Sequence, residues 1–268
     1  DAPMMPKMQK IKDGTAQRQK ARDFDDITRE VLNIAISVFR CLICTKAPFP
    51  ETTLVESQLA KDSWREACQQ TNIEVKLTLP LMSLILKRTS HVRGELKTKL
   101  RSLVGPFFGF RARDSREGIK WNWDLAENLK EGSRFAYAVW PQNCSISGIY
   151  KSELLQVAIN EMWFANRNDE GVVYHKYFNP MPTTTMALLL AVIECCIDEW
   201  ATGIKADIKF TAAAYATVYN DHLISLHAFD EHTVAYDLLG QIQQTLHDNA
   251  RYVLHHTSST LTVTGSRN

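Results

Sequence analysis

The longest apolar run of the chain lies in the stretch FNPMPTTTMALLLAVIECCIDEWATG, residues 178–203. Pro182 suits the first turn of a helix, and Gly203 suits a position just after the end of one. Between them, residues 186–193 are apolar without interruption, so all faces of the helix are apolar over these turns. Such a helix has to be enclosed by other helices. The stretch therefore predicts a buried central helix within a helical bundle.

The charge of the chain is divided unevenly along its length. Residues 1–150 hold 24 lysines and arginines against 17 acidic residues, whereas residues 151–268 hold 7 against 13, within a net charge of +1. The basic half would attract a polyanion. We prefer the interpretation that the two halves face each other and neutralise their charges. With 45% hydrophobic and 23% charged residues, the composition is that of an ordinary globular domain.

Two carboxylates follow the apolar run and limit what its helix can be. The run is far shorter than the ~20 residues that a membrane span needs, and Glu194 and Asp198 come directly after it. We therefore expect no membrane partner. The two carboxylates lie four residues apart on one helical face, which suits metal binding or acid and base chemistry. A solvated edge or pairing with the basic half is the better interpretation, because no second acidic pair is nearby.

Helical periodicity recurs along most of the chain, and alternating strand patterns are almost absent. Asp25 or Asp26 suits the N-cap of the first helix, and Asn122 suits that of a short one. The expected helices cover about residues 27–42, 53–70, 81–104, 124–131, 154–163, 182–203, 210–227 and 232–254. We predict an all-α fold, with one bundle-like domain of seven or eight helices over residues 23–256. A basic, flexible arm at 1–22 precedes it and a frayed tail at 257–268 follows it.

The six cysteines are too sparse for the disulfide framework of a small secreted domain. Cys41 and Cys44 form a CxxC, but they come late in a helical pattern, whereas a redox CxxC lies at a helix N-terminus. We interpret them as core residues, and no second CxxC completes a zinc site. The cysteine content favours a reducing compartment, so we expect an intracellular protein of the nucleus or cytoplasm.

Basic residues dominate the segment 87–113, where Glu95 is the one acidic residue. Phe107, Phe108 and Phe110 lie among the last of them. Basic side chains would neutralise phosphates there, while an exposed phenylalanine stacked on a base. We favour the alternative, in which a long helix has a solvated basic face and the phenylalanines belong to the core. The candidate nucleic-acid-binding residues are Lys87, Arg88, Arg93, Lys97, Lys99, Arg101, Arg111 and Arg113.

Familiar catalytic motifs are missing from the sequence, which contains no GxxxxGK[ST], no GxSxG and no GxGxxG after a strand. Among its eight histidines, His222, His227 and His232 are spaced by five. This spacing turns successive side chains about 140° around a helix, which does not suit a shared metal. DFDD at 23–26 suits helix capping, and Cys144 has no nameable histidine partner. We expect no catalytic residue, no metal and no cofactor.

Three runs follow one another in the second half: GIYKSELLQVAINEMWFANRNDEGVVYHKYFNPMP, MALLLAVIECCIDEWATG and IKFTAAAYATVYNDHLISL. Their characteristic residues are Trp163, Phe164, Phe178, Pro180, Pro182, Ala187, Leu188, Glu199, Trp200, Gly203, Phe210, Tyr215 and Tyr219. In this order they resemble a domain-of-unknown-function family abundant in mushroom-forming basidiomycete fungi. APFP and SHVRGELKTK upstream extend the resemblance to about residues 27–254. The resemblance implies an uncharacterised helical domain, often placed after a long polar region, and no particular activity.

These observations favour a non-catalytic intracellular binding module. We expect a protein partner or self-association, and nucleic acid is a further candidate partner through the basic helix and the arm. The alternative is an enzyme or a metal-binding protein that uses the carboxylates and histidines of residues 151–268.

Overall fold

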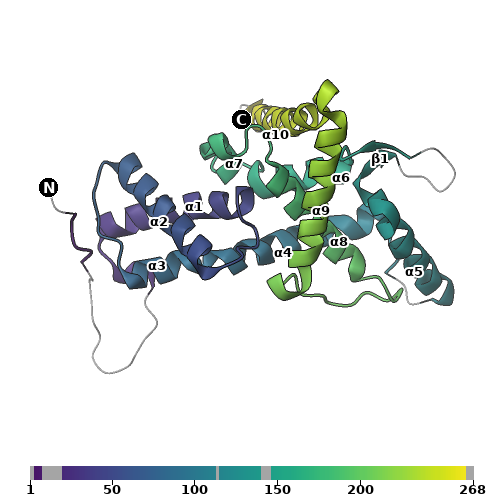
Figure 1. Cartoon of the computed structure of the whole chain (residues 1–268), viewed down its shortest axis with the longest axis horizontal. Coiled ribbons are helices and arrows are strands. Elements are labelled where there is room, and N and C mark those ends of the chain that lie inside the picture. Colours follow the sequence, from purple (N-terminus) through teal and green to yellow (C-terminus); the bar gives the residue numbers. More distant parts are fainter. Residues whose placement is uncertain (1–2, 8–19, 113–114, 140–145, 264–268) are drawn as a thin grey trace. The chain divides into compact units, whose positions relative to one another are not determined.

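The computed structural model describes the backbone of residues 3–7, 20–112, 115–139 and 146–263, and the side chains of these ranges up to Tyr252. Over these ranges the fold is all-α, as the sequence predicts, and its one sheet is a two-stranded hairpin (Figure 1). The α-helices are α1 (Asp26–Thr45), α2 (Thr53–Thr71), α3 (Leu79–Leu86), α4 (Arg88–Phe108), α5 (Arg116–Lys130), α6 (Glu153–Trp163), α7 (Glu170–Val173), α8 (Thr183–Asp198), α9 (Ala212–Thr233) and α10 (Leu238–Val263).

The chain divides into two compact units, residues 1–92 and residues 93–268. The division falls inside α4, so that its first turn belongs to the first unit and the remainder to the second. The extent of a single domain over residues 23–256 stays a prediction.

Helices α1, α2 and α3 form the first unit. The Asp25 carboxylate starts α1 by accepting a hydrogen bond from the Thr28 N–H at 2.9 Å. Cys41 and Cys44 are buried in the last turns of the same helix. Both are therefore core residues, as the sequence predicts. The other buried residues of the apolar stripe of this helix are Val31, Ala35, Val38, Phe39 and Leu42.

Part of the predicted N-terminal arm pairs with the first unit. The Met4 N–H donates to the Glu74 carbonyl at 2.7 Å, and the Lys76 N–H donates to the Met4 carbonyl at 2.9 Å. Met4 thereby forms a parallel bridge with Val75. Backbone hydrogen bonds therefore hold this part of the arm in place, and residues 8–19 of it lie outside the described ranges.

The single helix predicted over residues 81–104 is instead two helices, α3 and α4, which meet at Lys87. Its apolar positions still face inward, because Ile85, Val92 and Leu96 are fully buried. Helix α4 continues to Phe108 with Pro106 inside it. From the glycine and proline residues of this segment, the sequence instead predicts an irregular connection. The proline removes one helical hydrogen bond and its ring crowds the preceding turn, and the helix ends two residues later at Phe108.

Helix α5 begins at Arg116, well before the predicted start at residue 124. The Ser115 hydroxyl caps it by accepting a hydrogen bond from the Gly118 N–H at 3.1 Å. Asn122, the predicted cap, is buried inside the helix. The cap is therefore a serine that lies seven residues upstream of the predicted asparagine.

Asn122 satisfies backbone groups outside its own helix. Its Nδ2 donates to the carbonyl oxygens of Arg111 and Gly203, both at 2.9 Å, and its Oδ1 accepts from the Arg111 N–H at 2.8 Å. Buried backbone groups need such partners. The asparagine therefore connects α5 with the segment after α4 and with the turn after α8.

Helix α8 is the central helix of the second unit, as the sequence predicts. Its side chains from Thr185 to Ile197 are buried except that of Glu194, because α5, α6 and α9 pack around it. In Figure 1, α8 and α9 lie next to each other in green. Over the described residues, every helix is too short or too polar to cross a membrane.

The boundary between the last two helices differs from the prediction. Helix α9 continues through residues 228–232 (AFDEH) to Thr233, since this segment contains no glycine or proline to end it. Val234–Tyr236 and Asp237, which has a φ of 47°, form the corner before α10. Helix α10 extends to Val263, into the range predicted as a frayed tail.

Two short strands form the sheet of the second unit. In the antiparallel pair β1 (Tyr137–Val139) and β2 (Ser147–Ile149), Tyr137 lies opposite Ile149. Strands of three residues are too short to show an alternating pattern in the sequence. The hairpin was therefore not predicted.

Gly203 allows the turn after α8 to approach α5 closely. Its φ is 82°, and a Cβ placed there would lie 2.2 Å from the carbonyl oxygen of Ile119. Other residues rarely adopt this backbone conformation, and the space beside it is filled. The predicted cap glycine is therefore also a packing residue.

We expect Gly203→Ala to lower the free energy of unfolding by at least about 2 kcal/mol, because the backbone conformation is strained and the added methyl group meets backbone atoms. Gly94→Ala in α4 is the matched control, since a Cβ there meets nothing within 4 Å. In a helix interior, alanine is favoured over glycine by up to ~1 kcal/mol. Urea unfolding followed by circular dichroism measures both, and equal effects of the two substitutions would contradict the packing role of Gly203.

Candidate functional site

Glu199, in the turn that follows α8, lies at the centre of a buried ionic cluster. The residue is 1% exposed. The Lys97 Nζ lies 3.0 Å from its Oε1, and the Arg101 Nε lies 2.9 Å from its Oε2. Lys97 also donates to the Cys195 carbonyl at 3.1 Å, and Arg101 lies 3.1 Å from Asp207. Two predicted nucleic-acid-binding residues are therefore engaged inside the second unit.

The environment of Lys97 keeps its ammonium group charged. Burial by itself would lower the pKa of Lys97, but Cys196, Cys195 and the Glu199 carboxylate outweigh burial and raise it. Burial also raises the pKa of the nearby Cys196 thiol to about 12, so this sulfur stays protonated at neutral pH. The pair of Lys97 and Glu199 is thus a buried ion pair, and Lys97 does not present its charge to solvent.

The other predicted basic residues differ in exposure and in partners. Lys99 lies 3.4 Å from Glu95 and donates to the Glu161 carbonyl at 2.8 Å. Arg88 contacts His91 at 3.2 Å. Lys87, Arg88, Arg93, Lys99 and Arg101 are half-buried, Arg111 is exposed, and Arg113 lies outside the described residues. Among those of these residues that the structure describes, Arg111 is therefore the exposed one.

We expect Glu199→Gln to lower the free energy of unfolding by about 3 kcal/mol, because it leaves the Lys97 charge buried without its carboxylate. The double variant Lys97→Met with Glu199→Gln is expected to be more stable than Glu199→Gln alone. Urea unfolding of both variants provides the comparison.

Lys99→Gln serves as the control, since the half-exposed pair with Glu95 is worth less than about 0.5 kcal/mol. A loss in Glu199→Gln no larger than in Lys99→Gln would show that the buried pair does not stabilise the fold.

Glu194 and Asp198 of α8 form a second cluster with side chains from two other helices. Lys130 of α5 lies 2.6 Å from Asp198 and 4.0 Å from Glu194. The Tyr215 hydroxyl of α9 donates to Asp198 at 2.9 Å, and the His222 Nε2 lies 2.8 Å from Glu194. The cluster therefore joins α5, α8 and α9.

The second cluster has the character of a packing contact. Asp198 and Glu194 raise the pKa of Lys130 although burial opposes them, and burial together with Cys195 and Asp198 raises that of Tyr215. These carboxylates pair with the basic half through Lys130, which is one of the two alternatives that the sequence left open. Sequence reasoning missed Lys130 and identified Tyr215 only as a family-motif residue, because no spacing relates either of them to α8.

The three histidines of α9 face different directions, as their spacing predicts. His222 is buried against Glu194, whereas His227 and His232 are exposed. Across the ranges that the structure describes, no three histidine, cysteine or acidic side chains gather in a way that would hold a metal ion. Cys144 lies outside those ranges.

The aromatic residues in the last turn of α4 and just after it are partly core and partly surface. Phe108 is buried, while Phe107 is 38% exposed. Phe110 stacks on Trp200 with ring centroids 4.9 Å apart. The exposed Arg111 guanidinium lies 4.3 Å from the ring centroid of Trp121, a cation–π contact.

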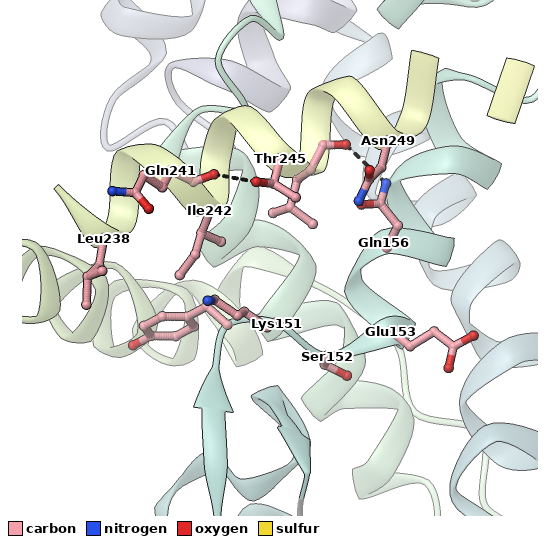
Figure 2. A pocket seen from close by; sticks show the side chains of 11 residues that line it. Lys151, Ser152, Glu153, Gln156, Leu238, Gln241, Ile242, Thr245 and Asn249 are labelled. Carbon is pink, nitrogen blue, oxygen red and sulfur yellow. Dashed lines mark hydrogen bonds between the residues drawn. The ribbon is translucent and has the colours of Figure 1, made fainter. Parts of the chain in front are cut away.

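A groove lies between the beginning of α6 and α10, with a cavity volume of about 360 Å³ (Figure 2). Figure 2 shows Leu238, Ile242 and Thr245 of α10 on one wall and Lys151 and Ser152 on the other. The further lining residues are Tyr150, Glu153, Gln156, Gln241, Leu246 and Asn249. We call this the α6–α10 groove. Sequence reasoning missed it, because its walls lie about 90 residues apart in the chain.

Large apolar side chains are exposed where α9 turns into α10. Val234 is 72% exposed, Tyr236 is 73% exposed and Leu238 is 37% exposed. We call these three residues the apolar corner. Leu238 also lines the α6–α10 groove, so the corner and the groove are continuous.

The residues that carry the family resemblance make packing contacts. The ring centroids of Trp163 and Phe164 lie 5.3 Å and 6.3 Å from that of Phe178. Pro182 is the N-cap residue of α8, and the Asn179–Pro180 peptide bond is cis. These residues build the segment that leads into the central helix.

The later motif residues pack around the end of α8 and the beginning of α9. Phe210 lies 5.2 Å from Tyr215 between ring centroids, and Tyr219 is buried. Glu199, Trp200 and Gly203 take part in the ionic cluster, the stack on Phe110 and the close approach to α5. The resemblance therefore rests on residues that stabilise the fold.

A family model described as Domain of unknown function (DUF6532) matches residues 34–229. Since the match covers most of the chain, the protein belongs to this family of uncharacterised domains. The matched range runs from α1 into α9, and α10 with its wall of the groove lies beyond it. No curated protein and no solved structure shows significant similarity to the chain.

Proposed function

We propose that the chain is a non-catalytic protein-interaction module whose contact surface is the apolar corner together with the α6–α10 groove. The observation that carries the proposal is the exposure of Val234, Tyr236 and Leu238 beside a concave surface. Contiguous exposed apolar surface marks protein interfaces, where aromatic side chains are enriched. The partner is a protein or a second copy of the chain.

The state of the ionisable groups supports binding over catalysis. Glu194, Asp198 and Glu199 each have a cation within 4.0 Å. A catalytic acid or base has to reach the substrate, and these carboxylates are engaged in joining helices. The α6–α10 groove contains none of them.

We also infer an intracellular setting, in the nucleus or cytoplasm of a mushroom-forming basidiomycete. The fungal setting rests on the family resemblance. The compartment rests on the cysteines, since those that the structure describes are buried thiols. A reducing compartment keeps such thiols intact.

The double variant Val234→Ser with Tyr236→Ser is expected to lose its partner, because it removes the exposed apolar contacts while changing no buried residue. We expect at least a roughly tenfold loss of the captured partner, as for central interface residues elsewhere. Affinity capture from an extract of the source organism, quantified by mass spectrometry, measures it.

Leu54→Ser in α2 is the matched control, since Leu54 is 74% exposed and far from the corner in sequence. The proposal predicts proteins that Leu54→Ser retains and the double variant loses. Identical sets of captured proteins for both variants would exclude the apolar corner as the contact surface.

A second candidate partner is single-stranded nucleic acid, which one observation favours. The exposed Arg111 lies on the ring of Trp121, with Phe107 also partly exposed. An arginine beside exposed aromatic rings suits a phosphate together with a stacked base. This candidate site combines the end of α4 with Arg111 and with Trp121 of α5, whereas the sequence placed most of the contacts along α4.

Arg111→Gln is expected to make the dependence of log affinity on log salt shallower by about 0.7, because one phosphate contact is lost on single strands. Fluorescence anisotropy with labelled DNA and RNA oligonucleotides over a salt series measures it. Lys209→Gln, which changes another exposed cation, should leave the slope unchanged. Absence of binding at low salt would exclude this candidate.

A further inference from the structure

We propose that the α6–α10 groove binds the C-terminal end of a partner protein chain, taking its last apolar side chain and its carboxylate. This inference rests on the proposed function and identifies the chemistry of the partner. The groove has two ends of different character, which match the two parts of such a terminus.

The apolar part of the groove is built by α10 and by the residue before α6. Ile242, Leu246 and Tyr150 are nearly buried and line it, with Leu238 at the edge toward the apolar corner. A volume of about 360 Å³ lies at the small end of the range for ligand pockets. It suits one or two amino-acid residues and is too small for a folded element.

The start of α6 supplies groups that favour an anion. The N–H groups of Glu153 and Leu154 donate to no described residue, and the N-terminus of a helix has a positive partial charge. Lys151 is exposed beside it and forms no ion pair within the described residues. Figure 2 shows the Glu153 carboxylate directed away from Lys151.

Ser152 is the second, independent indication of a ligand. Its side chain lines the groove, although the residue is only 4% exposed. It occupies the N-cap position of α6 but makes no capping hydrogen bond. The hydroxyl is thus open to the groove on an otherwise buried residue, and a ligand carboxylate at the helix N-terminus would accept its hydrogen bond.

The polar lining favours a peptide over a fatty acid. Gln156, Gln241 and Asn249 bring carboxamide groups to the groove, and Thr245 brings a hydroxyl. Gln156 and Asn249 are already connected across it, since the Asn249 Nδ2 donates to the Gln156 Oε1 at 3.3 Å. Gln241 and Thr245 already donate to the carbonyl oxygens of Tyr236 and Gln241, but their side-chain oxygens can still accept from the N–H groups of a peptide. An acyl chain offers no such donor.

The test uses the full chain and a fluorescein-labelled pool of pentapeptides, Gly-Ser-Gly-Ser-X, where X is Val, Ile, Leu, Met, Phe, Tyr or Trp with a free carboxylate. Fluorescence anisotropy should show saturable binding of the pool. The same pool with C-terminal carboxamides should bind at least roughly tenfold more weakly, because a charge-assisted contact is lost. Decanoate should not displace the free-acid pool.

Lys151→Gln should weaken binding of the free-acid pool by roughly tenfold and leave the affinity for the carboxamide pool unchanged. Lys209→Gln is the matched control and should change neither. Equal binding of the two pools, displacement by decanoate, or no binding of the free-acid pool would each overturn the inference. The protein-interaction proposal would survive that result if capture of a partner still depended on Tyr236 and not on Lys151.

Discussion

The burial of α8 is the constraint on which the second unit depends. A helix that is apolar on every face needs neighbours on every side, and the carboxylates at its C-terminal end are thereby withdrawn from water. The negative end of the helix dipole makes these charges still less favourable. Unpaired buried charges are very costly, so cations must accompany the burial. Lys97, Arg101 and Lys130 supply them and thereby fix α4 and α5 against the central helix.

This pairing also explains the uneven charge of the sequence. The three cations belong to the basic half of the chain, and Glu194, Asp198 and Glu199 belong to the acidic half. Basic residues around Lys97 that suggest a basic surface in the sequence are therefore paired with acidic residues inside the second unit. The family motifs belong to the same scaffold, whereas the apolar corner and the α10 wall of the groove lie past the matched residues 34–229. The other wall of the groove, with Lys151 and Ser152, lies inside the matched residues, so the proposed contact surface combines both parts of the chain.

The sequence predicted helices well where periodicity is long and regular, as in α1, α2 and α8. It failed at boundaries that tertiary contacts decide. Asn122 has the chemistry of a helix cap, but buried carbonyl groups of Arg111 and Gly203 compete for its side chain. The segment AFDEH looks polar enough for a turn, yet it contains nothing that prevents α9 from continuing. The three-residue strands of the hairpin were too short to leave a periodic signal.

By itself, the sequence determined the class of fold and the buried central helix, and for the carboxylates of that helix it left a solvated edge or pairing with the basic half. The class of fold and the central helix follow from apolar periodicity, and the two alternatives for the carboxylates follow from the cost of leaving a charge buried and unpaired. Both can be inferred from the sequence without knowing which residues meet in space. Only the tertiary structure decided which cation meets which carboxylate, and that Lys97 faces inward while Arg111 remains exposed. It also created the α6–α10 groove, because such a site requires residues far apart in the chain to lie on facing walls, and no local pattern encodes that proximity.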